Sequence, residues 1–155
     1  FVLVDIPRTA ELLKKESEVT LSVAVKEVAE ILGEEAKVKE KVNEEDIKNS
    51  LEEIDKFVHL VRFGNQSCPG ILPLGTAQLI DVKKAFLMKL IVEEGSADSV
   101  SCMDWAINTK LLSQFDASII SEEAQRAFIE AIPGNLKGIK GNVQAIWGFF
   151  EGAEV

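Results

Sequence analysis

The chain has few of the side chains that acid–base and covalent catalysis use. Among its 155 residues there is one histidine, His59, and no tyrosine, and both types are common proton-transfer groups. No serine stands in a Gly-x-Ser-x-Gly turn, and no glycine-rich loop precedes a helix in the form that binds phosphate. A Cys68–His59 nucleophile pair would lack a third, orienting group. We therefore interpret His59 as a half-buried structural residue and predict no enzyme and no catalytic residue.

Metal-binding patterns are missing as well. One histidine and two distant cysteines do not complete a structural zinc site. The acidic stretch 116–123 lacks the ligand spacing and the central glycine of a calcium loop, and helix capping explains its composition. The sequence therefore predicts neither a metal site nor a cofactor.

The charge of the chain argues against binding to nucleic acid, and the length of its apolar runs argues against a membrane-spanning helix. A net charge of −9 opposes binding to the phosphates of a nucleic acid. No run approaches the ~18 apolar residues of a membrane-spanning helix, because Lys83, Lys84 and Lys89 interrupt the best candidate. The hydrophobic fraction of 46% is nevertheless ample for a folded core.

The residues that are present follow helical periodicity almost throughout. Apolar side chains recur at three- and four-residue intervals, and strand-like alternation is confined to a short candidate at 1–6. The segments predicted to be helical are 8–32 (one helix or two), 43–63, 76–92, 99–114, 121–132 and 135–150. We predict an all-α fold, a compact bundle of about six or seven helices in a single domain, 1–155.

Cys68 and Cys102 flank one strongly apolar stretch, and the sequon Asn65-Gln66-Ser67 precedes the first of them. As free thiols they would be small core residues. Their number and placement favour instead a disulfide that clamps the helix 76–92 against its successor. With the sequon, this indicates a secreted protein with Asn65 as a candidate glycosylation site.

The segment 135–150 is unusual because glycines punctuate an apolar helix. Gly134 and Gly138 are four residues apart and Gly141 continues the same side, so another helix or a flat ligand can approach the backbone closely. Three alternatives remain open for this helix: a central core position, the wall of an apolar cavity, or a face for self-association or a membrane surface.

Two functions fit these features. The first is a secreted carrier of an apolar small molecule, such as a fatty acid or a similar lipid, in a cavity with lysines at its mouth. Its predicted ligand-binding residues are Phe86, Leu90, Ile139, Val143, Ile146, Trp147, Phe150, Lys137 and Lys140. The second is a secreted protein-interaction or immune-modulating factor with a solid core, no ligand and an exposed apolar face.

Overall fold

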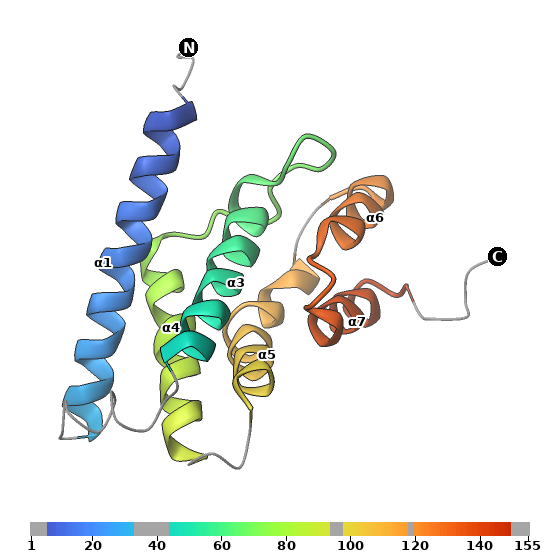
Figure 1. Cartoon of the computed structure of the whole chain (residues 1–155). Coiled ribbons are helices and arrows are strands. Elements are labelled where there is room, and N and C mark those ends of the chain that lie inside the picture. The colour runs from blue at the N-terminus through green and yellow to red at the C-terminus, as the bar shows by residue number, and fades with distance from the viewer. Residues whose placement is uncertain (1–5, 33–43, 94–97, 118–119, 150–155) are drawn as a thin grey trace.

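The computed structural model describes residues 6–32, 44–93, 98–117 and 120–149 (Figure 1). Within these ranges the chain forms six α-helices and one 3₁₀-helix and contains no strand, which confirms the all-α prediction. The helices are α1 (Ile6–Leu32), α3 (Glu44–Phe63), α4 (Thr76–Val92), α5 (Ser99–Lys110), η1 (Leu112–Ala117), α6 (Glu122–Ala131) and α7 (Lys137–Ile146).

Several helix ends lie where the sequence predicts them. The side chains of Asp98 and Ser121 cap α5 and α6 by accepting hydrogen bonds from the backbone N–H three residues on. Gly64 follows α3 with a φ of +68°, and a Cβ at this position would lie 2.2 Å from the Cys68 carbonyl oxygen. Only glycine fits that turn, so α3 ends there.

Other helix ends differ from the prediction. The Thr76 side chain is of a type that caps helices, but the N-cap of α4 is Gly75, whose N–H donates to the Gln78 side chain. The helix predicted for 99–114 ends at Lys110 and continues as η1. The last helix is shorter than predicted and ends at Ile146. The strand predicted at 1–6 and Asn43, the first residue of the helix predicted at 43–63, lie outside the described residues, apart from Ile6, which is helical.

The helices are arranged around one common core (Figure 1). α1 and α4 run in the same direction and pack along each other, α3 runs antiparallel to α1, and α5 packs against α4 on the side away from α1. α6 and α7 lie beyond α5. At that end the rings of Phe57, Phe115, Phe128 and Trp147 contact one another, with centroids 5.6–6.4 Å apart.

The predicted disulfide is wrong, because Cys68 and Cys102 are separate, free and buried. Cys68 lies in the loop after α3, where its thiol donates to Asn65 Oδ1 at 3.3 Å. Cys102 faces the core from α5, and burial, reinforced by the nearby Glu93 carboxylate, raises the pKa of its thiol. Each sulfur therefore serves as a small core residue.

The free thiols give a direct test. A thiol reagent added to the native protein should react slowly with both cysteines, because both are buried and a raised pKa disfavours the reactive thiolate at Cys102. Unfolding in guanidinium chloride without a reductant should release two thiols per chain. If no thiol is released under those conditions, Cys68 and Cys102 form a disulfide after all.

Candidate functional site

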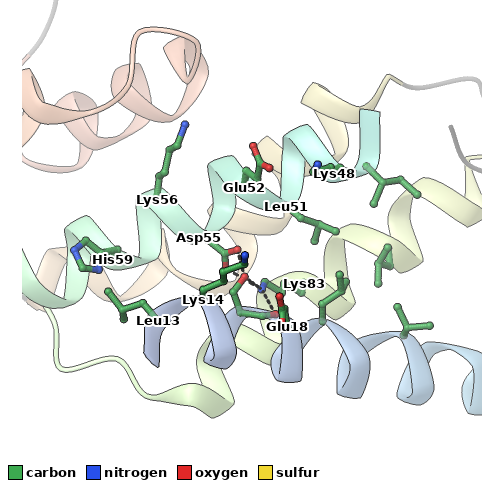
Figure 2. A pocket seen from close by; sticks show the side chains of 15 residues that line it. Leu13, Lys14, Glu18, Lys48, Leu51, Glu52, Asp55, Lys56, His59 and Lys83 are labelled. Atoms are coloured by element: carbon green, nitrogen blue, oxygen red, sulfur yellow. Dashed lines mark hydrogen bonds and ion pairs between the residues drawn. The ribbon is translucent and has the colours of Figure 1, made fainter. Parts of the chain in front are cut away.

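An open groove of about 830 Å³ lies between α1, α3 and α4 (Figure 2). Two helical stripes with four-residue spacing form its walls. The stripe on α1 is Leu13, Ser17, Leu21 and Val25, and the stripe on α3 is Ile47, Leu51, Asp55 and His59. The floor is formed by Lys83 and Leu87 of α4, and charged residues occupy the rims.

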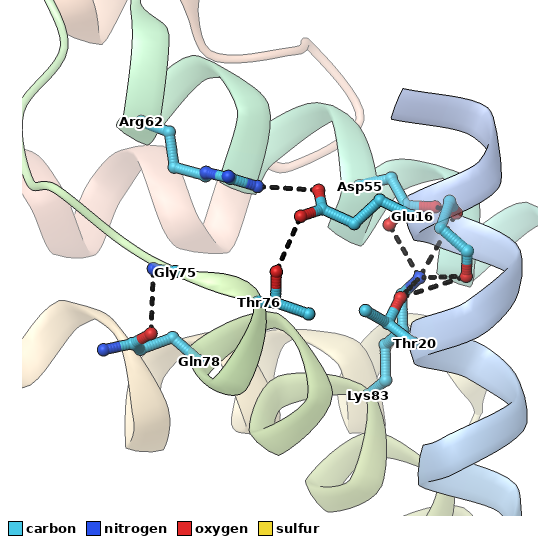
Figure 3. Close-up of polar contacts among 9 residues, drawn as sticks. Glu16, Thr20, Asp55, Arg62, Gly75, Thr76, Gln78 and Lys83 are labelled. Atoms are coloured by element: carbon cyan, nitrogen blue, oxygen red, sulfur yellow. Dashed lines mark hydrogen bonds and ion pairs between the residues drawn. The ribbon is translucent and has the colours of Figure 1, made fainter. Parts of the chain in front are cut away.

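A buried lysine joins the three helices at the floor of the groove (Figure 3). Lys83 is fully buried, and its Nζ donates to Ser17 O at 3.1 Å, Ser17 Oγ at 3.3 Å and Thr20 Oγ1 at 3.0 Å. Asp55 Oδ1 of α3 lies 2.8 Å from the same nitrogen. These two atoms form an ion pair, but their angles do not meet those of a hydrogen bond. The Ser17 hydroxyl also donates to Asp55 Oδ2. These oxygens use the full donor capacity of the ammonium, so Lys83 acts as a structural tie.

A second polar cluster fastens α1 at the adjoining end of the groove. Glu16 accepts hydrogen bonds from the Arg62 guanidinium of α3 and from the Thr76 hydroxyl of α4, both at 2.8 Å. Burial alone would raise the pKa of Glu16, but these two hydrogen bonds and the Arg62 charge outweigh it and lower the pKa. The cluster therefore stabilises the fold at neutral pH and loses that contribution as the pH falls through the glutamate range.

The rims of the groove carry charge of both signs. Lys14 and Glu18 lie on α1, and Lys48, Glu52 and Lys56 lie on α3, again four residues apart. Lys56 pairs with Glu53 at 3.3 Å. Within the described ranges no ion pair is found for Lys14 or Lys48, so both ammonium groups face solvent. His59 is exposed at the end of the groove and tilts against Phe63, which corrects its interpretation as a half-buried residue.

The structure does not gather the predicted ligand-binding residues into one cavity. Of the eight that lie within the described residues, none lines the groove. Phe86, Ile139 and Val143 are fully buried in the core, and Leu90 packs against it. Ile146 lines a separate, shallower hollow of about 420 Å³.

The other four predicted residues have different surroundings. Trp147 stacks on Phe115 and donates its indole N–H to the Phe115 carbonyl at 3.1 Å, so it is a core residue. Lys137 is exposed and Lys140 half-buried on α7. Phe150 lies outside the described residues. Asn65 is exposed, and its Oδ1 accepts hydrogen bonds from the backbone N–H groups of Ser67 and Cys68.

The close helix approach predicted at the glycines occurs at Gly138 alone. A Cβ there would lie 2.7 Å from Asp104 Oδ2 of α5, whereas Cβ atoms at Gly134 and Gly141 would meet no atom within 4 Å. Asp104 Oδ1 is buried without a hydrogen-bond partner. Burial, together with the Asp98 charge, raises the pKa of Asp104.

Replacing Asp104 with asparagine should therefore stabilise the protein. A raised carboxyl pKa means that the folded state binds the proton more tightly, so its contribution to stability falls as the pH rises through that pKa. Asp104→Asn removes the unpaired charge and should add about 1 kcal/mol to the free energy of unfolding at neutral pH. Denaturant titrations should show the gain shrinking in acid; a gain independent of pH would contradict the electrostatic cause.

The sequence does not point to the groove, because its most unusual segment is the glycine-rich end of the chain. The spacing of Leu13, Leu21 and Val25 was visible, but such a stripe usually marks a core face. The better signal is Lys83, the first of two lysines, Lys83 and Lys84, that stand between the buried residues Val82 and Ala85. A buried lysine requires partners from other elements, and these partners define the floor of the groove.

Comparison with known proteins adds no family: no family model, curated protein or solved structure matches the chain. Among the described helices, none has the length and apolar character needed to cross a membrane. Within the same residues, no group of three or more His, Cys, Asp or Glu side chains is arranged to hold a metal ion. The function must therefore be inferred from the groove itself.

Proposed function

We propose that the protein is a non-enzymatic carrier that binds a hydrophobic small molecule, a fatty acid or a similar lipid, in the groove between α1, α3 and α4. The groove carries this proposal: its volume of about 830 Å³ lies within the ~300–1,000 Å³ typical of small-molecule sites. Leu21, Val25, Ile47, Leu51 and Leu87 give it a continuous apolar surface. This site replaces the cavity predicted along α7.

The side chains of the groove support binding better than catalysis. Lys83 is fully buried and its Nζ is held by Asp55, Ser17 and Thr20, so it is placed to join the helices and not to contact a ligand. The Ser17 hydroxyl already donates to Asp55. His59 is exposed at one end of the groove. The polar groups thus hold the walls together, while apolar side chains provide the binding surface.

A tryptophan placed in the groove tests the proposal. Val25 is half-buried in the α1 wall, so Val25→Trp should fill the apolar part of the groove and abolish binding of decanol measured by calorimetry. Val19→Trp is the matched control, because Val19 is 53% exposed on the same helix and does not line the groove. Calorimetry is preferred to intrinsic fluorescence because neither Trp105 nor Trp147 lines the groove.

Two outcomes would reject this function. Absence of saturable decanol binding by the delipidated wild-type protein is one. Equal binding by Val25→Trp and the wild-type protein, with unchanged thermal unfolding, is the other, because the ligand would then lie elsewhere.

A second candidate is a protein-interaction factor, for which the rims of the groove provide the specific observation. Lys14 and Glu18 on α1, and Lys48, Glu52 and Lys56 on α3, alternate in sign at four-residue spacing. An amphipathic partner helix with the complementary pattern would match both rims. This candidate predicts that Val25→Trp blocks a protein partner while decanol fails to bind the wild-type chain.

We also propose that the protein is secreted. Because the two cysteines are free, support for secretion comes from the Asn65 sequon alone. The sequon lies in an exposed loop after α3, where a glycan would extend into solvent. The mass of the Asn65 peptide from natively expressed protein tests this proposal, and an unmodified asparagine would remove its remaining support.

A further inference from the structure

We infer that the groove binds its ligand in one orientation, with an anionic head group beside Lys14, toward the His59 end, and an alkyl tail at the end lined by Val25 and Ile47. This inference rests on the proposed function and names the class of ligand, a long-chain carboxylate. The predicted carboxylate partners Lys137 and Lys140 lie outside the groove lining, so the head group requires a different cation.

The groove is graded in polarity along its length. The Ser17–Asp55 hydrogen bond sets the antiparallel register of α1 and α3 and divides the groove into two parts. Beyond it in one direction the facing stripes carry only apolar residues, Leu21 and Val25 on α1 and Leu51 and Ile47 on α3. At a rise of 1.5 Å per residue, the eight residues from Ser17 to Val25 give this part a length of about 12 Å.

The other part of the groove is polar and short. In Figure 2, Leu13 and His59 lie together at the end opposite Lys48, with Asp55, Lys83 and Lys14 between the two ends. Beyond Leu13 and His59 the adjoining space is a pocket of only about 50 Å³, where the paired side chains of Glu16 and Arg62 lie. This end therefore has room for a head group and none for a tail.

Charge along the groove favours an anion at the same end. Asp55 is neutralised by Lys83, Lys56 by Glu53, and Glu16 of the adjoining pocket by Arg62. On the His59 side of the Asp55–Lys83 pair, Lys14 is therefore the remaining charge of the groove lining within the described residues. On the Val25 side the lining carries Glu18 and Glu52 against Lys48. At the Val25 end a carboxylate would meet Lys48 but also the negative charges of Glu18 and Glu52, and it would lose hydration among the apolar side chains. Beside Lys14 it gains an ion pair at the solvent boundary.

Paired titrations of decanoate and decanol separate the head group from the tail. Lys14→Ala should weaken decanoate binding about three- to five-fold, the effect of losing one exposed ion pair, and leave decanol binding unchanged. Lys48→Ala removes the same charge at the other end of the groove, and Lys15→Ala removes an exposed lysine of α1 outside the lining. Lys15→Ala should not change the affinity for decanoate, and Lys48→Ala should weaken it less than Lys14→Ala does.

The tail is tested by extending the acid one methylene at a time. Affinity should rise about four-fold per methylene while the chain still fills the apolar part of the groove, and then level off. The increment should be the same in the wild-type protein and in Lys14→Ala, because the head group and the tail contact different parts of the groove.

The results that overturn this inference differ from those that reject the proposed function. If decanol binds but decanoate does not, the groove is apolar and the anionic head group is wrong. If Lys48→Ala weakens decanoate binding as much as Lys14→Ala, the orientation is wrong. If Lys14→Ala weakens decanol equally, Lys14 acts by packing. If neither compound binds, the inference and the carrier function fail together.

Discussion

Replacing Phe128 with alanine should lower the free energy of unfolding by about 3–5 kcal/mol, the usual loss for a large aromatic side chain removed from a core. Phe128 is fully buried and connects α6 to the rest of the molecule through ring contacts with Phe57, Phe115 and Trp147. Few other contacts hold α6, so we expect α6 and α7 to loosen first. Chemical denaturation followed by circular dichroism measures the loss.

Phe63 is the matched control for this variant. It is 54% exposed at the end of α3, so Phe63→Ala should change the free energy of unfolding by less than about 1 kcal/mol. Trp147 emission should shift to longer wavelength in Phe128→Ala and stay unchanged in Phe63→Ala, because the Phe128 ring packs against the indole and the ring contacts of Phe63 are with His59 and Arg62. Equal losses in the two variants would contradict the assignment of the aromatic cluster as the centre of that end of the core.

Replacing Lys83 with methionine should lower the free energy of unfolding by about 3 kcal/mol. This value is at the lower end for a broken buried ion pair, because the Asp55 side chain keeps 27% of its surface exposed. Methionine fills most of the lysine volume but donates no hydrogen bond. Asp55 and the Thr20 hydroxyl would then lose the ammonium that joins α1, α3 and α4. Urea titration at neutral pH measures the effect.

Two further variants distinguish the buried tie from an ordinary surface pair. Lys84 is the neighbouring lysine and pairs with Glu27 at 3.0 Å near the surface, so Lys84→Met should cost less than about 1 kcal/mol. The loss of free energy of unfolding in the double variant Lys83→Met, Asp55→Asn should be smaller than the sum of the losses in the two single variants, because the double variant removes both charges of one pair. Additive losses would mean that Lys83 and Asp55 act independently.

The fold was largely predictable because helical periodicity is a local property. The Asp98 and Ser121 caps and the break at Gly64 could be read from single residues and their neighbours. The 3₁₀ continuation of α5 was harder to predict from the sequence, since Leu111, Leu112 and Phe115 continue an apolar pattern that also suits an α-helix. The two cysteines show the limit of counting: their number suggested a pair, but pairing depends on distance in the fold.

The groove was not predictable because it depends on how α1 and α3 are spaced. Leu21 and Leu51 look like core residues in the sequence, and the same spacing would occur if the two helices touched. The structure instead places α1 along α4, so the apolar stripes of α1 and α3 face each other across a gap. Lys83 contributes to this arrangement, since its bonds to Ser17 and Asp55 join the two helices at one point along their length.

The free state of Cys68 and Cys102 has a consequence for how the protein is made. Because no described element depends on a cross-link, the chain should fold with or without an oxidant. Expression in a reducing cytoplasm should yield the native protein directly, without oxidative refolding or disulfide isomerase. Burial of both thiols also protects the folded chain from mixed disulfides and intermolecular cross-links during storage.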